Sequence, residues 1–454
     1  MPVSFDSLRA SVSGGVLTPE DSQYEETRAL FNAMIEKQPA AIARCETSAD
    51  VAASIAFARA NELDIAVRAG GHSVAGHSLC DDGLVIDVRP MKTIQIDPAR
   101  KTARVGAGVT WGEFDGAAQE HDLVTTGGRV STTGVAGFTL GGGSGWIERS
   151  FGLACDNLIS VDLVTAAGEA VTASGDANSD LFWALHGGGG NFGVATSLEF
   201  RLHDLGPIVL AGLMMWDGNV GRDVALAYRD WSQTLPDEMG TGLVYLTGPP
   251  EEFVPEHLQG RTVIGLAACY TGDIAEGARV LALMRALSPE VDLVGEMPYA
   301  AFNSMLDDPP GKRNYWSAEY MAGFPDDAVD VFVKYAANLP SPFTQHIMLP
   351  WGGEVARVSA SDTPMTQRDA AWITHPFAVW EGEENDEANI RWAREYSADM
   401  KKFATGGIYL NFIGDEGQDR VRAAYGPNYD RIAKIKGRYD PDNIFRGNQN
   451  IQPA

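Results

Sequence analysis

The sequence predicts an α+β protein with two domains. It has 454 residues, whereas a single domain usually has about 150. Its 44% hydrophobic and 21% charged residues are typical of a globular chain that folds without disulfides or metals. Predicted strands and helices mix without a strict βαβ repeat, which favours α+β over a doubly wound sheet. A change of composition at 205–207 indicates the boundary between the domains.

Capping boxes and turn residues predict the elements of the first domain. Thr47 and Asp50 form a capping box before an alanine-rich helix, and Thr110 and Glu113 form a second one. Hairpin signatures stand at 97–100 and 166–169, between apolar runs. The predicted helices are 48–60, 111–120 and 179–185, and the predicted strands are 65–67, 84–87, 94–96, 102–105, 158–165, 170–173 and 194–200.

Hydrophobic periodicity predicts that the second domain is also α+β. Its predicted helices are 223–235, 274–287, 329–339 and 388–403, and its predicted strands are 243–247, 262–270, 344–349 and 408–412.

The charge and the cysteines limit the class of protein. A net charge of −26 disfavours binding to nucleic acid or to anionic lipid. Residues 1–15 lack an apolar signal-peptide core, and no apolar run approaches the ~18 residues of a membrane span. The four cysteines are widely spaced and the eight histidines show no zinc-like pairing. We therefore predict a cytoplasmic protein with free thiols and no metal site.

Glycine is concentrated in one part of the chain. Sixteen of the 50 glycines lie at 127–193, between predicted strands and helices, which indicates tight turns or close approach to a ligand. The run at 188–193 satisfies G-x-G-x-x-G. A dinucleotide-binding Rossmann motif needs a strand before this run and a helix after it. Because the predicted order here is the reverse, the sequence excludes that kind of site.

The segment Arg68-Ala69-Gly70-Gly71-His72-Ser73 is the strongest candidate for ligand binding. Its two glycines allow the backbone to approach a ligand, and successive N–H groups form a nest for phosphate. Arg68 would neutralise part of the phosphate charge, and His72 projects at the same place. On these residues alone, a structural histidine that caps a tight turn is an equally good interpretation.

Four ordered motifs resemble a known flavoprotein family. Residues 67–73, VRAGGHS, resemble the histidyl-FAD attachment motif of the vanillyl-alcohol-oxidase-type fold, and 134–145, GVAGFTLGGGSG, resemble its flavin-binding loop. The runs 151–158, FGLACDNL, and 181–187, LFWALHG, follow in the family's order. The tail at 448–451, NQNI, is similar to that of the berberine bridge enzyme-like subfamily.

The resemblance implies a PCMH-type FAD-binding domain at 37–206, a substrate-binding domain at 207–405, and a C-terminal segment at 406–454 that returns to the first domain. It also implies FAD bonded covalently to His72. The cofactor-binding residues that it implies are Arg68, Ala69, Gly70, Gly71, His72, Ser73, Gly76, His77, Gly128, Val130, Thr132, Thr133, Gly134, Gly137, Gly141, Gly142, Gly145, Asp156, Asn157, Val194, Tyr409, Asn448 and Asn450.

The resemblance further implies a single covalent attachment. Many family members add a bond from a cysteine that lies eleven residues before the G-G-G triplet, and this position is Val130 here. Cys155 lies in a later turn where the family has no attachment. The family position linked to oxygen access is Thr133, whose size, near that of valine, favours an oxidase.

The expected chemistry needs a base beside the flavin. A hydride leaves a carbon next to oxygen or nitrogen, and the O–H or N–H proton must be accepted. Tyr409 and Asn411 lie on a predicted strand and face the same side, and they resemble the family's Y-x-N pattern. This implies that Tyr409 is the base, with a lowered pKa; a core tyrosine bonded to Asn411 is the alternative. Weaker candidates are Tyr315, Tyr320 and His375, and the candidates for an aromatic pocket are Tyr299, Trp316, Trp351 and Trp372.

The expected function is an FAD-linked oxidase acting on an alcohol or amine carbon of a sugar or secondary metabolite, with O₂ reduced to H₂O₂. Two alternatives stay open: a dehydrogenase with another electron acceptor, and a redox-neutral catalyst of cyclisation that holds a flavin. The sequence gives no oligomeric state.

Overall fold

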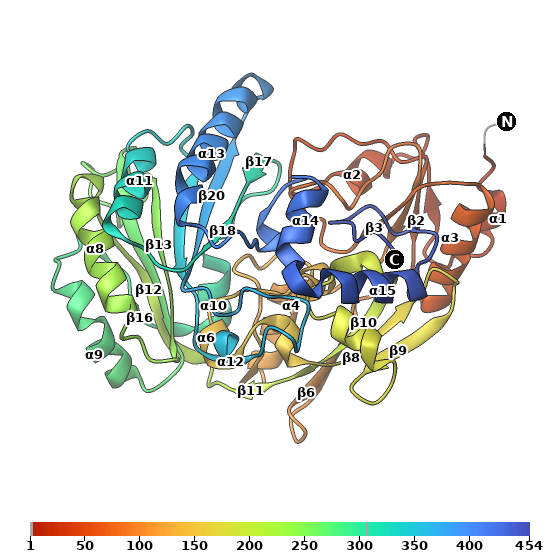
Figure 1. Cartoon of the computed structure of the whole chain (residues 1–454), viewed down its shortest axis with the longest axis horizontal. Helices are drawn as coiled ribbons and strands as arrows, with labels where there is room; N and C mark the ends of the chain where they lie inside the picture. Colours follow the sequence, from red (N-terminus) through yellow and green to blue (C-terminus); the bar gives the residue numbers. More distant parts are fainter. Residues whose placement is uncertain (1–2, 306) are drawn as a thin grey trace.

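The computed structural model describes residues 3–305 and 307–454. Two of the fifteen N-terminal residues, on which the absence of a signal peptide was argued, therefore lie outside the described residues. Figure 1 shows two halves side by side, and sheets and helices occur in both. The predicted α+β class is confirmed. Among the described residues, no helix combines the length and the apolar character that crossing a bilayer requires.

The first half contains two sheets. A four-stranded sheet has the order β1-β2-β4-β3, in which β2, β4 and β3 are parallel. A five-stranded antiparallel sheet has the order β5-β6-β10-β8-β9, and it contains both predicted hairpins. The strands are β1 (Val16–Leu17), β2 (Ala41–Arg44), β3 (Ile65–Arg68), β4 (Leu84–Asp87), β5 (Ile94–Asp97), β6 (Thr102–Gly106), β8 (Leu158–Val164), β9 (Ala170–Ser174) and β10 (Val194–Arg201), with the short pair β7 (Leu123–Val124) and β11 (His203–Asp204).

Helices cover these sheets and connect their strands. They are α1 (Asp6–Arg9), α2 (Tyr24–Arg28), α3 (Ser48–Ala60), α4 (Trp111–Gln119), α5 (Val135–Leu140), α6 (Glu148–Phe151) and α7 (Ser179–Ala184). A 3₁₀ turn at Gly189–Asn191 lies between α7 and β10. The predicted order is confirmed, because the helix α7 precedes the glycine run and the strand β10 follows it.

The capping box of α3 forms as predicted. Thr47 Oγ1 accepts the N–H of Asp50 at 3.2 Å, and the Asp50 carboxylate accepts the N–H of Thr47 at 2.9 Å. Thr47→Ala is expected to lower the free energy of unfolding by about 1 kcal/mol, because the Asp50 N–H loses its acceptor. Chemical denaturation would measure the change. Thr47→Ser retains the acceptor and should match the wild type; equal losses in the two variants would show that the cap is not the cause.

The N-terminal segment belongs to the first sheet, although the predicted domain begins at residue 37. β1 pairs with β2 in antiparallel orientation. The side-chain amide of Asn32 donates to the carbonyls of Val74 and Asn314, at 2.9 and 3.0 Å, and so joins the two halves. No local pattern predicts this role, since the partners of Asn32 are distant in the chain.

The second half is one large, mainly antiparallel sheet with helices on its outer face. The strand order is β15-β12-β14-β13-β19-β20-β17, with β16 on β12 and β18 on β20. In Figure 1, α8, α9 and α11 lie on the side away from the first half, and α13 packs against α11 and β20. The strands are β12 (Ile208–Asp217), β13 (Met239–Thr247), β14 (Thr262–Tyr270), β15 (Val291–Asp292), β16 (Gly295–Pro298), β17 (Arg313–Trp316), β18 (Glu319–Met321), β19 (Gln345–Pro350) and β20 (Trp372–Trp380), and the helices are α8 (Gly221–Ser232), α9 (Ile274–Arg285), α10 (Tyr299–Met305), α11 (Asp326–Ala336), α12 (Glu354–Arg357) and α13 (Asp386–Met400).

The C-terminal segment returns to the first half through α14 (Gln418–Tyr425) and α15 (Tyr429–Tyr439). It is anchored by Lys436, whose ammonium is fully buried and lies 2.6 Å from the Asp440 carboxylate. Lys436 also donates to the carbonyl of Asn191, at 2.7 Å. The predicted strand at 408–412 is wrong: a 3₁₀ turn, Leu410–Phe412, follows Tyr409, because the polar side chains there bind a loop of the first half and not a neighbouring strand.

Candidate active site

Two glycine loops from distant parts of the chain cross at Gly70 and Gly134. A Cβ atom on Gly70 would lie 2.2 Å from the backbone nitrogen of Gly134, and a Cβ on Gly134 would lie 2.4 Å from the nitrogen of Gly70. Only glycine permits this approach at both positions. The crossing brings together the predicted attachment segment, which follows β3, and the predicted flavin loop 134–145, whose first residue, Gly134, is the N-cap of α5.

His72 projects beside this crossing and is half-buried. Its ring stacks on Phe31, with ring centroids 4.3 Å apart. The hydroxyl of Thr132 lies 3.0 Å from Nε2, and that of Thr133 lies 3.5 Å from Nδ1. Burial lowers the pKa of His72 to about 4. The ring is therefore neutral near pH 7 and retains a lone pair, the form in which an imidazole acts as a nucleophile.

The Arg68 side chain has a different role from the one expected. It donates to the carbonyls of Thr27 and Ala29 and so ties the N-terminal segment to the end of β3. Burial lowers its pKa to about 10, which still leaves it charged near neutral pH. These bonds give the guanidinium a structural role, and its predicted neutralisation of phosphate stays a prediction.

Tyr409 reaches the second glycine loop. Its phenol oxygen accepts the N–H groups of Gly143 and Ser144, both at 2.8 Å, and the Asn411 amide at 3.1 Å. Asn411 also donates to the carbonyl of Phe138, at 3.0 Å. The prediction that the two side chains face the same side is confirmed, although the backbone is not a strand. The loop has no space for larger residues, since a Cβ on Gly141 would lie 2.0 Å from Asn411 Oδ1.

The pKa of Tyr409 differs from the expected one. The side chain is 1% exposed, and burial raises the pKa above its ordinary value of 10, against the lowering effect of the three N–H donors. Tyr409 is therefore protonated at neutral pH in this environment. The lowering of this pKa by the flavin, which the family resemblance implies, stays a prediction.

Aromatic rings form a continuous wall between His72 and Tyr409. The wall begins at His72 and its neighbour Phe31. The ring centroids of Phe31 and Trp316 are 6.1 Å apart, and those of Trp316 and His375 are 5.8 Å apart. His375 stacks on Phe412 at 4.3 Å, and Phe412 meets Tyr409 edge-on at 4.7 Å. Since the rings come from the N-terminal segment, the large sheet and the C-terminal segment, the wall lies where these parts of the chain meet.

The other aromatic candidates divide between this wall and the core. The ring centroid of Trp351 lies 6.1 Å from that of Tyr409 and 5.6 Å from that of Tyr320. Trp351 and Tyr320 therefore both lie beside the site. Trp372 packs against Tyr228 and Phe324 in the helix layer, Tyr299 is buried among residues of β12 and β14, and the hydroxyl of Tyr315 contacts Arg394. A small cavity lies beside Tyr409, lined in part by Gly141, Tyr320 and Met365.

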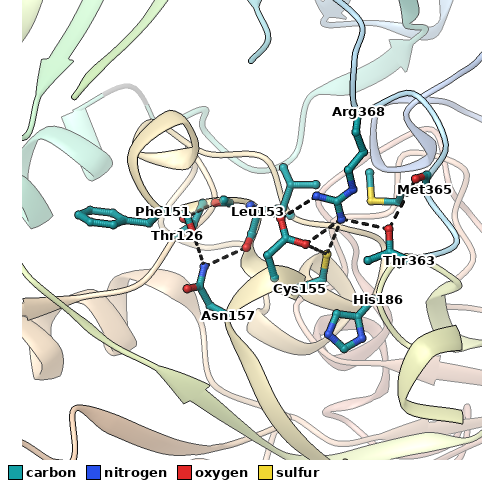
Figure 2. Close-up of polar contacts among 12 residues, drawn as sticks. Thr126, Phe151, Leu153, Cys155, Asn157, His186, Thr363, Met365 and Arg368 are labelled. Atoms are coloured by element: carbon teal, nitrogen blue, oxygen red, sulfur yellow. Dashed lines mark hydrogen bonds and ion pairs between the residues drawn. The ribbon is translucent and has the colours of Figure 1, made fainter. Parts of the chain in front are cut away.

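Asp156 and Asn157 support the fold with their side chains. Figure 2 labels Asn157 and the Asp156 partner Arg368. The Asp156 carboxylate accepts two hydrogen bonds from Arg368, each 2.7 Å long, and one from the N–H of Leu153. Asn157 donates to the carbonyls of Phe151 and Leu153. These side chains are occupied within the protein, and the cofactor contacts implied for Asp156 and Asn157 stay predictions.

Cys155 lies in the same cluster and is fully buried. Burial raises the pKa of its thiol well above the ordinary value, so the thiolate needed for a covalent bond is disfavoured. Arg368 was missed by the sequence analysis. Arg368 belongs to a long loop of the second half. Its partner Asp156 is 212 residues away in the sequence, so no local pattern identifies the pair.

The C-terminal tail and His77 supply buried polar atoms without a hydrogen-bond partner among the described residues. A Cβ on Gly447 would lie 3.2 Å from the Ile65 carbonyl and 3.6 Å from that of His77, so the tail lies against the start of β3 and the segment around His77. Among the described residues, the buried atoms His77 Nε2, Asn448 Oδ1 and Asn450 Oδ1 have no hydrogen-bond partner. Buried polar atoms normally have partners. These, with the glycine crossing, fit an elongated polar group such as FAD.

The other candidates lie on the same segments. Gly76 and Gly142 have positive φ angles of 71° and 117°, a region that favours glycine. The remaining residues are Ala69, Gly71 and Ser73 beside His72; Gly128 and Val130 in the segment before Thr132; Gly137 on α5; Gly145, where a Cβ would meet the carbonyl of Gly127; and Val194, which opens β10.

Comparison with known proteins agrees with this geometry. The families described as "FAD binding domain" and "Berberine and berberine like" match residues 39–174 and 408–452. (R)-6-hydroxynicotine oxidase of Paenarthrobacter nicotinovorans is 31% identical over 98% of this chain and 97% of its own. The FAD-linked oxidoreductase YgaK of Bacillus subtilis is 28% identical over 98% of both chains. The solved structure of 6-hydroxy-D-nicotine oxidase from Arthrobacter nicotinovorans has a TM-score of 0.88 at 28% identity and covers 98% of this chain and 99% of that one. With this identity over nearly its whole length, the chain belongs to the berberine bridge enzyme-like family of FAD-dependent oxidoreductases.

Proposed function

We propose that this enzyme is an oxidase that removes a hydride from a carbon bearing a hydroxyl or amine group in a small molecule, with FAD bonded covalently to His72 alone and O₂ reduced to H₂O₂. The observation that carries the proposal is the position of the His72 ring, held between Phe31 and Thr132 at the glycine crossing. FAD supplies the redox chemistry, while the protein binds and orients the reactants.

We further propose a division of labour along the chain. Residues 37–206, with the N-terminal segment and the returning 406–454, would hold the FAD, and 207–405 would bind the substrate. The loops at Gly70, Gly134 and Gly141–Gly145 would approach the FAD through their backbones. His77, Asn448 and Asn450 would supply polar atoms that have no partner among the described residues.

The aromatic wall favours a substrate with a flat or apolar part next to the carbon that is oxidised. The name of the relative (R)-6-hydroxynicotine oxidase describes such a substrate, an aromatic ring that carries an amine. Thr133, close to His72 Nδ1, is small and supports reaction with O₂. Among similar folds, Phl p 4 has glucose dehydrogenase activity whereas a single-residue variant of it is a glucose oxidase, so one side chain decides the acceptor there.

The test has two stages. The purified protein is precipitated with acid, and the yellow colour is expected to remain with the pellet, because a covalent flavin survives unfolding. The protein is then mixed without oxygen with alcohols and amines, including 6-hydroxynicotine, benzyl alcohol and glucose. Bleaching followed by rapid recolouring in air with peroxide release is the expected result. Slow recolouring would indicate a dehydrogenase, and turnover with a permanently oxidised flavin would indicate redox-neutral chemistry.

A further inference from the structure

The side chains of β20 alternate between the two faces of the large sheet, and His375 lies on the face towards the first half. Thr374 points the other way, where its hydroxyl contacts that of Tyr396 in the helix layer. Phe377, two residues after His375, packs with Phe31 and Trp316. Since side chains alternate along a strand, His375 belongs to the face that carries the aromatic wall.

One ring nitrogen of His375 is committed to the backbone. Nδ1 lies 2.8 Å from the carbonyl oxygen of Ser317, which can only accept a hydrogen bond, so Nδ1 carries the hydrogen. Nε2 of the neutral ring then holds a lone pair. It makes no hydrogen bond to any residue in 3–305 or 307–454.

The ring is neutral over the physiological range. Burial lowers its pKa to about 4; the Ser317 carbonyl opposes this shift and the Arg129 guanidinium adds to it. The other charged or titratable groups on the packed elements include His346 on β19, Glu319 and Tyr320 on β18, and Arg313 and Tyr315 on β17. Glu416, which accepts the Ser317 hydroxyl, and Tyr409 behind Phe412 lie on the C-terminal segment. His346, on the opposite face of the sheet, is fully buried between aromatic rings.

Packing fixes the direction of the ring. Phe412 stacks on it with an interplanar angle of 12°, and Trp316 and Phe377 meet it edge-on, at 89° and 77°. Trp316 contacts Phe31, which stacks on His72, and Phe412 contacts Tyr409. His375 is therefore held within the wall that joins the attachment histidine to the glycine-loop tyrosine.

Tyr409 is a poorer proton acceptor than His375. Its oxygen already accepts three hydrogen bonds, and its burial favours the protonated phenol. An acceptor must be deprotonated near the working pH and able to reach the substrate proton. Of the two, only the imidazole has a lone pair without a hydrogen-bond partner.

We propose that Nε2 of His375 accepts the hydroxyl or amine proton of the substrate. The proposal rests on the proposed function and specifies its base. FAD, when bound, would accept the hydride of the C–H bond. The O–H or N–H bond of the substrate would break, its proton would go to Nε2, and its electron pair would form the C=O or C=N bond of the product. The imidazolium afterwards releases the proton to water.

The test compares two variants of the yellow holoenzyme. His375→Asn retains an N–H that can donate to the Ser317 carbonyl but has no base, and His375→Ala leaves a space the size of the ring. The substrate is the panel compound that bleaches the wild type fastest. With it, the flavin of both variants is expected to be reduced about 10²–10⁴-fold more slowly than that of the wild type. Imidazole in the buffer is expected to restore part of the rate in His375→Ala only.

The pH profile provides a second measurement. The wild-type rate should stay level from pH 8 to pH 5 and fall towards pH 4 as Nε2 becomes protonated, whereas the residual rate of His375→Asn should lack this fall. His346→Phe, on the opposite face, is the matched control and should keep the wild-type rate and profile.

The outcomes separate the two proposals. Rates near that of the wild type in both His375 variants, or no rescue by imidazole, would overturn the role of His375 and leave the proposed function standing. If 6-hydroxynicotine, benzyl alcohol and glucose all fail to bleach the wild type, the proposed function fails, and the proposal that His375 is the base fails with it. Should His375→Ala not bind flavin, the rate and pH profile of His375→Asn decide the question.

Discussion

His72→Ala is expected to yield a protein whose flavin passes into the supernatant on acid precipitation. Noncovalent FAD would still bind, since the glycine crossing and the tail atoms are unchanged. The flavin would lose the bond through which the protein raises its reduction potential. We therefore expect anaerobic bleaching to slow by about tenfold, which corresponds to ~1.4 kcal/mol in activation free energy. Absorbance of pellet and supernatant, then stopped-flow spectroscopy, measure the two effects.

Two controls accompany this variant. His121→Ala removes an exposed histidine and should keep the colour in the pellet. Cys155→Ser should also keep it, because the buried thiol is in the wrong form for attachment. Colour retained in the pellet of His72→Ala, or flavin found by mass spectrometry on a tryptic peptide containing Cys155, would contradict single attachment through His72.

Tyr409→Phe is expected to lower the free energy of unfolding by about 3 kcal/mol, because the buried N–H groups of Gly143 and Ser144 both lose their acceptor. The glycine loop should then shift, and the flavin absorption spectrum and the bleaching rate should change with it. We expect the rate to fall by about tenfold, with its pH profile unchanged. Thermal denaturation and stopped-flow reduction measure these effects.

The same variant separates two roles of Tyr409. If the tyrosine were the base, its loss would slow reduction by about 10²–10⁴-fold and remove a limb of the pH profile, with little change in stability. Asn411→Asp is a useful comparison, since a carboxylate cannot donate to the Tyr409 oxygen or to the Phe138 carbonyl. A Tyr409→Phe protein as stable as the wild type would contradict the supporting role.

Local patterns predicted the parts of the site that are continuous in sequence. The attachment segment at His72, the glycine loop at 134–145 and the capping box at Thr47 each carry their signal within a few residues. The strand at 408–412 was predicted from its apolar residues. It failed because Tyr409 and Asn411 bind a loop rather than a sheet edge, which periodicity does not encode.

The rest of the site depends on contacts between distant segments. Phe31 stacks on His72 although the N-terminal segment carries no motif. Arg368 pairs with Asp156 across 212 residues, and its side chain is 2% exposed. The pKa values of His72, Tyr409 and His375 follow from burial, which depends on the whole fold. A sequence without an alignment gives the chemistry of such residues but not their neighbours.

The loop around Arg368 has a consequence for how the enzyme holds together. Trp183 on α7 donates to the carbonyl of Ser361, Asn428 donates to that of Thr363, and Arg368 meets Asp156. The second half is thus interleaved with the first, and Asn32 adds a further crossing at the other end of the chain. A hinge motion would have to expose a buried ion pair, which is costly. A cut between residues 206 and 207 would therefore not release two autonomous folding units, and the two halves should melt as one.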